Sequence, residues 1–199
     1  MLDLTDIFAT FPTLKTERTV LREATIDDTE DIFRIMSDAD VMRYLGRPPM
    51  ALLDDAVERI QSYQVLFEEE EAVSWVITHA EDGQVMGTCL FWHLNRPHFR
   101  AEIGYILGSA WWGQGIMTEV GSTLLDFGFS RMGLHSVEAQ LDPDNMASRR
   151  LLEKLGFVQE GHFRENFYDS MKAEFTDTAV YSLLKTVWAS RTSPPSVQS

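Results

Sequence analysis

A glycine-containing turn between an expected strand and an expected helix constrains this fold more than any other feature of the sequence. The strand-like AEIGYILGSA runs into WWGQG, and IMTEV then begins a stretch without proline or glycine until Gly121. Gly113 and Gly115 allow left-handed backbone angles and let another molecule approach the main chain closely. Because the first N–H groups of a helix have no partner within it, such a turn can hold an anion such as a phosphate. An ordinary tight connection could use the same residues, so the turn alone leaves both interpretations open.

Strand-like and helix-like patterns alternate on both sides of this turn. Strands are expected at residues 19–24, 72–80, 84–94, 101–107, 135–142, 157–163 and 174–184, and helices at residues 25–37, 53–70, 116–131 and 145–155. EDG at residues 81–83 predicts a hairpin, Thr25 with Asp28 predicts a capping box, and Gly156 predicts a helix end. Because the hairpin precedes a strand–helix–strand unit, the expected fold class is α/β (α+β), with a mixed, mostly antiparallel central sheet flanked by helices.

Composition and charge limit the function classes. The 199 residues, of which 44% are hydrophobic and 24% charged, suit one globular domain with a proper core. A formal net charge of −14 opposes binding to nucleic acid and favours cationic partners. No apolar run reaches membrane-spanning length and no leader peptide is recognisable, so we expect a cytoplasmic protein without a membrane partner. Cys89 is the single cysteine and the histidines lack metal-ligand spacing, so we expect neither a disulfide nor a metal site.

Four segments, in this order, resemble a known family. AEIGYIL, WWGQGIMTEV, LDPDNMASRRLLEKLGF and VQEGHFRE together resemble the Gcn5-related N-acetyltransferase (GNAT) superfamily, in particular the RimJ/RimL-like branch that acetylates ribosomal protein N-termini. The superfamily's cofactor signature maps onto residues 112–117, with Trp112 where Gln or Arg is usual and Met117 where a small residue is usual. The resemblance covers residues 16–188, which we expect to form the acetyltransferase domain. Residues 1–15 are then an N-terminal extension, and residues 189–199 are expected to be a disordered tail.

The resemblance implies that the chain moves an acetyl group from acetyl-coenzyme A, its co-substrate, to a primary amine. In the family the cofactor's diphosphate lies on the N–H groups of this turn and of the helix that follows. The pantetheine arm bonds to the preceding strand, which splays away from the strand at residues 135–142 and so leaves main-chain groups free. The cofactor-binding residues that the resemblance implies are Tyr105, Ile106, Leu107, Trp112, Gly113, Gln114, Gly115, Ile116, Met117, Thr118, Asn145 and Ser148.

Glu102 is the candidate general base, because the family commonly has an acid on this strand beside the cofactor cleft. A carboxylate partly buried among apolar neighbours has a raised pKa, which suits base catalysis. The alternative is an inert charge on the exposed face of an edge strand. Ser148 is the implied acid for the departing thiolate, although an alcohol is a poor acid and both Asn145 and Ser148 are also routine residues at a helix start. A backbone N–H near Ile106 would stabilise the oxyanion.

The acceptor is the least constrained part of this prediction. We expect a protein or peptide α-amine, whose reference pKa of about 8, against about 10.4 for lysine, leaves roughly 100 times more neutral amine at pH 7. A small amine such as a polyamine, an aminoglycoside or a metabolite is an open alternative. A sensor that binds acyl-coenzyme A without turnover is a second open alternative. Assembly as a homodimer is also left open.

Overall fold

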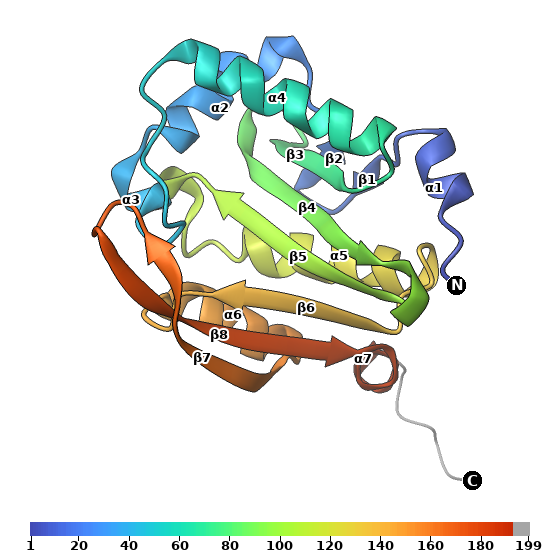
Figure 1. Ribbon diagram of the computed structural model, residues 1–199. Coiled ribbons are helices and arrows are strands. Elements are labelled where there is room, and N and C mark those ends of the chain that lie inside the picture. Colours follow the sequence, from blue (N-terminus) through green and yellow to red (C-terminus); the bar gives the residue numbers. More distant parts are fainter. Residues whose placement is uncertain (193–199) are drawn as a thin grey trace, which may run out of the picture.

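An eight-stranded sheet runs through the computed structural model, which describes residues 1–192 (Figure 1). The strand order is β1-β2-β3-β4-β5-β6-β8-β7, and neighbours are antiparallel except β5 and β6, which are parallel. The strands are β1 (Leu14–Lys15), β2 (Thr19–Arg22), β3 (Val73–His79), β4 (Val85–Asn95), β5 (Arg100–Leu107), β6 (Ser136–Leu141), β7 (Val158–Asp169) and β8 (Glu174–Leu184). The expected mixed, mostly antiparallel sheet is therefore confirmed.

Helices cover both faces of the sheet. They are α1 (Thr5–Ala9), α2 (Thr29–Met36), α3 (Ala39–Met42), α4 (Leu53–Glu68), α5 (Ile116–Ser130), α6 (Met146–Leu155) and α7 (Lys185–Thr192). Helices α2 and α4 share one buried apolar cluster with Val76 of β3, whereas α5 and α6 share the other with Trp75. Successive side chains of a strand point to opposite faces, so Trp75 and Val76 serve different cores. The predicted hairpin is the β3–β4 pair.

Elements at the two ends of the chain differ from the prediction. Leu2, Leu4 and Ile7, which fall in the predicted extension, are buried in the core beside α5. Short elements such as α1 are stabilised by this packing rather than by a sequence pattern of their own, so no periodicity predicts them. Residues 189–192 complete α7, and the rest of the predicted tail lies outside the described residues. No helix within residues 1–192 has the length and apolar character needed to cross a membrane.

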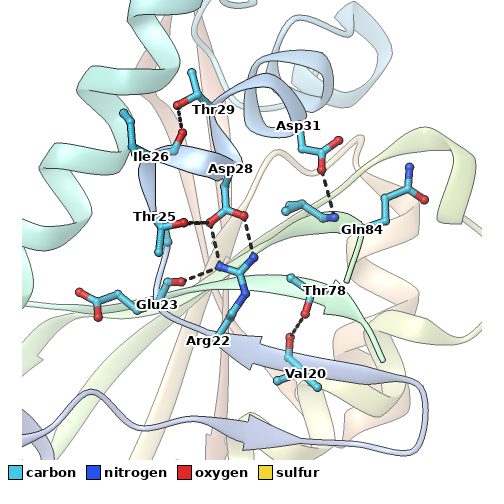
Figure 2. Close-up of polar contacts among 12 residues, drawn as sticks. Val20, Arg22, Glu23, Thr25, Ile26, Asp28, Thr29, Asp31, Thr78 and Gln84 are labelled. Atoms are coloured by element: carbon cyan, nitrogen blue, oxygen red, sulfur yellow. Dashed lines mark hydrogen bonds and ion pairs between the residues drawn. The ribbon is translucent and has the colours of Figure 1, made fainter. Parts of the chain in front are cut away.

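A half-buried ion pair fixes the connection between β2 and α2 (Figure 2). Arg22 donates to both carboxylate oxygens of Asp28, at 2.7 and 2.8 Å, and the backbone N–H of Thr25 donates to Asp28 Oδ2 at 2.8 Å. Burial alone would raise the pKa of Asp28, but the hydrogen bonds from Arg22 and Thr25 outweigh it and hold that pKa below its usual value. The predicted capping box is present, although its first turn is a 3₁₀ turn, Ile26–Asp28, and the α-helix starts at Thr29.

Strands β5 and β6 separate at the centre of the sheet. They pair only from Arg100 opposite Ser136 to Glu102 opposite Glu138, although β5 continues to Leu107 and β6 continues to Leu141. The predicted splay is confirmed. Beyond Glu102, the edge of β5 that faces β6 has main-chain groups that β6 does not use, and these can bond another molecule.

Candidate active site

The glycine turn lies directly before α5, as predicted. Gly113 and Gly115 have φ values of 73° and 78°, in the left-handed region that favours glycine. A Cβ built on Gly113 would have no protein atom within 4 Å, so the packing of the protein itself does not require glycine there. Within residues 1–192 the backbone N–H groups of residues 113–117 have no hydrogen-bond partner. Unpaired N–H groups at a helix N-terminus fit the diphosphate of a nucleotide cofactor.

Arg18, from the turn between β1 and β2, holds this segment in place. Its Nη1 donates to the carbonyl of Gln114 at 3.0 Å, and its Nε donates to Glu119 Oε2 of α5 at 2.7 Å. The Gln114 side chain is also used inside the turn, because its Nε2 donates to the carbonyl of Ala110 at 2.9 Å. Arg18 was not predicted, since a sequence separation of 96 residues from Gln114 leaves no local signal.

A cavity of about 540 Å³ opens beside the turn, between the end of β5 and the first turn of α6. Every predicted cofactor-binding residue except Gln114 lines it. Trp112 donates from its Nε1 to the carbonyl of Leu107 at 2.8 Å and so ties the turn to the end of β5. We call this space the donor cavity.

A second cavity, of about 510 Å³, meets the first where β5 and β6 splay apart. Tyr105, Ile106, Asn145 and Ser148 line both spaces. The other polar lining residues of the second space include Arg47, Arg59, Tyr63, His93, Glu102, Gln140, Asp142, Asp169 and Asp177. We call it the acceptor cavity. Two substrates entering from the two sides can therefore meet beside Tyr105 and Ser148.

Glu102 lines the acceptor cavity from a central strand. Its side chain is buried, since the residue is only 8% exposed, and β5 has neighbours on both sides, so Glu102 does not lie on the exposed face of an edge strand. Burial raises the pKa of Glu102, and the hydrogen bond from His93 opposes that rise without cancelling it. Glu102 Oε2 lies 3.0 Å from His93 Nδ1 and 3.4 Å from Gln140 Nε2.

His93 is a contact that the sequence does not reveal. It sits at an irregularity of β4, where pairing with β5 shifts between Trp92 and Asn95, and its φ of 47° is left-handed. The ring stacks on Trp92 with centroids 3.9 Å apart, and the side chain is 63% exposed. The imidazole therefore connects the buried carboxylate of Glu102 to solvent.

Asn145 and Ser148 lie together at the start of α6. Asn145 Oδ1 accepts a hydrogen bond from the Ser148 backbone N–H at 3.1 Å, so the capping interpretation is confirmed, while both residues also line the two cavities. The Ser148 side chain lies near enough to the Tyr105 hydroxyl to lower the pKa of that phenol, against the larger effect of burial. Burial raises the pKa of Tyr105 to about 12, which keeps this phenol protonated at neutral pH. Tyr105 and Ser148 thus form a hydroxyl pair at the junction of the cavities.

Metal binding and thiol chemistry gain no support from the described residues. Within the described part of the chain, no group of three or more His, Cys, Asp or Glu side chains could hold a metal ion. Cys89 is fully buried, and burial raises the pKa of its thiol far above the ordinary value, so it behaves as a small apolar side chain.

Comparison with known proteins finds similarity to N-acetyltransferases. Residues 18–158 match the family described as "Acetyltransferase (GNAT) domain". YoaA of Bacillus subtilis (strain 168), an uncharacterized N-acetyltransferase, is 38% identical over 175 residues, which are 88% of this chain and 98% of the relative. Spermidine N(1)-acetyltransferase of Escherichia coli (strain K12) is 26% identical over 74% of this chain and 77% of its own length.

Two further comparisons concern acceptors of different kinds. YdaF of Bacillus subtilis (strain 168), whose name marks it as a candidate ribosomal N-acetyltransferase, is 32% identical over 54% of this chain and 57% of its own length. A crystal structure of spermidine N-acetyltransferase from Vibrio cholerae, in complex with CoA and spermine, superimposes with a TM-score of 0.75. That match is 22% identical and covers 86% of this chain and 98% of the other.

Proposed function

We propose that this chain, which belongs to the GNAT family of N-acetyltransferases, acetylates the α-amine of a protein or peptide N-terminus. Membership of the family makes acetyl-coenzyme A the acyl donor and an amine the acceptor. The observation that carries the proposal is the meeting of the donor and acceptor cavities at the splayed edge of β5, with Glu102 on the acceptor side.

The donor cavity suits acetyl-coenzyme A through its backbone. We assign the diphosphate to the N–H groups of residues 113–117 and the pantetheine arm to the free edge of β5 at residues 105–107. When bound, the cofactor supplies an activated acetyl thioester. Asn145 and Ser148 would contact it from α6, and the hydroxyl pair of Tyr105 and Ser148 lies where a departing thiolate could take up a proton.

Glu102 is the proposed general base on the acceptor side. An ammonium group must lose a proton before its nitrogen can attack, and a carboxylate with a raised pKa is better matched to that task at neutral pH. Glu102 would accept the proton directly or through a water molecule. The imidazole of His93, whose Nδ1 lies 3.0 Å from Glu102 Oε2, would take up that proton on Nδ1 in the tautomer that carries its hydrogen on Nε2, and it would release the Nε2 proton to solvent, because the ring is largely exposed.

A polyamine is the second candidate acceptor. Asp142, Asp169 and Asp177 line the acceptor cavity, and two of the similar proteins are named as spermidine acetyltransferases. Support for the α-amine comes from the resemblance to a candidate ribosomal acetyltransferase and from the larger neutral fraction of an α-amine at pH 7.

The test compares acceptors directly. Acetyl-coenzyme A consumption is followed with short peptides that have free or blocked N-termini, alongside spermidine and an aminoglycoside, and mass spectrometry locates the modified nitrogen. We expect the free termini to react fastest. If blocked peptides or the small amines are acetylated as quickly, the choice of acceptor is wrong while the acetyltransferase activity stands.

A further inference from the structure

Two arginines line the acceptor cavity without a carboxylate partner. Arg47 lies in the loop between α3 and α4, and Arg59 lies on α4. Within residues 1–192 neither guanidinium makes a hydrogen bond or an ion pair, and Arg59 instead stands over the ring of Tyr63, 5.9 Å from its centroid. A shortage of acids does not explain this, because the chain has 31 acidic residues against 17 lysines and arginines.

Keeping these two charges together is unfavourable in the absence of an anion. Both residues are half-buried. Burial lowers the pKa of Arg47, and the nearby charge of Arg59 lowers it further. A planar guanidinium hydrogen-bonds carboxylates and phosphates in pairs, so two of them at one cavity wall form a typical recognition site for an oxyanion.

The loop that carries Arg47 is held at both ends. The carbonyl of Gly46 accepts a hydrogen bond from Ser170 Oγ at 3.1 Å, and a Cβ on Gly46 would lie only 2.1 Å from the ring of Phe167. The loop thus packs directly on the end of the β7–β8 hairpin, which reaches the region of α3 (Figure 1). At its other end, the backbone N–H of Met50 donates to the carbonyl of Met36 at 2.9 Å. Arg47 is therefore presented to the cavity from a fixed support.

The carboxylates in the same cavity already have partners. Lys172 lies 3.4 Å from Asp142 and 3.5 Å from Asp169, and His162 lies 2.6 Å from Asp177. Among the charged side chains that line the acceptor cavity, Arg47 and Arg59 are thus the ones without a hydrogen bond or an ion pair to another described residue. A polyamine would bring further ammonium groups towards them.

We propose that the acceptor carries an oxyanion, either a carboxylate or a phosphate, in addition to its amine, and that Arg47 and Arg59 bind this group while Glu102 faces the amine. This inference rests on the proposed function and narrows its substrate class to peptides with an acidic or phosphorylated residue close to a free N-terminus. It differs from the expectation, drawn from the net charge, that cationic acceptors are preferred.

The experiment uses pairs of peptides with free N-termini. Members of a pair differ only by Asp against Asn, or by phosphoserine against serine, at one of the first three positions, so the two arms separate a carboxylate from a phosphate. In either the Asp/Asn pairs or the phosphoserine/serine pairs, we expect kcat/KM of the wild-type chain to be about 10- to 100-fold higher for the anionic peptide. This is the range for hydrogen bonds to charged groups. Arg47→Gln and Arg59→Gln should reduce that ratio towards one, mainly through KM.

Conservative and control variants keep the test specific. Arg47→Lys and Arg59→Lys retain the charge and should keep part of the preference even if a glutamine variant folds poorly. Arg131→Gln, at the exposed end of α5 and outside both cavities, should behave like the wild type. Thermal melts of every variant identify loss of fold.

Three outcomes overturn the inference. They are equal use of neutral and anionic members by the wild type, a preference that survives in folded glutamine variants, and spermidine as the better acceptor. Calorimetry with acetyl-coenzyme A separates this failure from that of the proposed function. Acetyl transfer without any anion preference contradicts only the inference, whereas acetyl-coenzyme A binding without transfer to any free N-terminus contradicts the proposed function as well.

Discussion

The donor and acceptor cavities share a wall but are built in opposite ways. The donor cavity takes its main polar groups from the backbone of one short segment, residues 113–117, with left-handed glycines and unpaired N–H groups. The acceptor cavity takes its polar groups from side chains on separate elements, among them Arg47, Arg59, His93 and Glu102. A backbone site keeps its ligand through most substitutions, as long as no new side chain enters the ligand's space, whereas a side-chain site can change its ligand by substitution. The donor side therefore defines the reaction, and the acceptor side defines the substrate.

The largest effect on turnover is expected on the acceptor side. Glu102→Gln should lower kcat by roughly 10² to 10⁴, the range for a general base. Because the proton acceptor must be ionised, wild-type activity should fall as the pH drops through the raised pKa of Glu102. The loss in the variant should shrink at high pH, where the amine is already neutral. Steady-state rates across pH measure both, and equal kcat in the two proteins at every pH would remove Glu102 from the mechanism.

A charge placed in the glycine turn should act on the donor side. Gly113→Glu should weaken acetyl-coenzyme A binding by about 10²- to 10³-fold, because a carboxylate beside the diphosphate costs several kcal/mol. Gly83→Glu is a matched control, since Gly83 has a φ of 75° and, like Gly113, no protein atom within 4 Å of an added Cβ. The backbone strain is then the same in both. Calorimetry that finds equal affinities for the two variants would contradict the assignment of the turn.

The proton route through His93 should give a smaller effect. His93→Ala removes the exposed relay but leaves the Glu102 carboxylate, so we expect kcat to fall about tenfold with little change in KM, less than a general base contributes. A purely structural role would instead change the melting temperature and leave the shape of the pH profile unaltered. Added imidazole should restore part of the rate, and no response to imidazole together with a wild-type profile would count against the relay.

The smallest effect is expected from the hydroxyl at the junction. Ser148→Ala should change kcat by less than about threefold, because Tyr105 remains protonated beside the same position and an alcohol is itself a poor acid. The Asn145 cap is unaffected, since it bonds the backbone N–H of residue 148. Single-turnover rates provide the measurement. A loss of 100-fold or more would make Ser148 the acid and require a different account of the junction.

The same contrast explains what could be predicted from the sequence. The turn at Gly113 and Gly115, the Asn145 cap and the Gly156 helix end all follow from local backbone chemistry, so their residue types are visible in the sequence. The splay of β5 from β6 came from the family resemblance and is confirmed by the register.

The remaining parts of the site depend on contacts between distant segments. His93 meets Glu102 only because the register of β4 shifts between Trp92 and Asn95, and no period-two pattern reveals such a shift. Arg47 is positioned by Gly46 and Ser170, which are 124 residues apart in the chain. Tertiary packing of this kind leaves no pattern in either segment, so the acceptor cavity could not be assembled from sequence alone.

The most direct test of a backbone-built donor site is amide hydrogen exchange of the wild-type chain with and without acetyl-coenzyme A. The N–H groups of residues 113–117 have no partner in the protein, so they should exchange quickly in the free chain. Bound cofactor should slow exchange at these residues and at residues 105–107, while residues 59–66 of α4, which contact only the acceptor cavity, stay unchanged. Protection confined to the acceptor side, or no protection at residues 113–117 at saturating cofactor, would contradict the account.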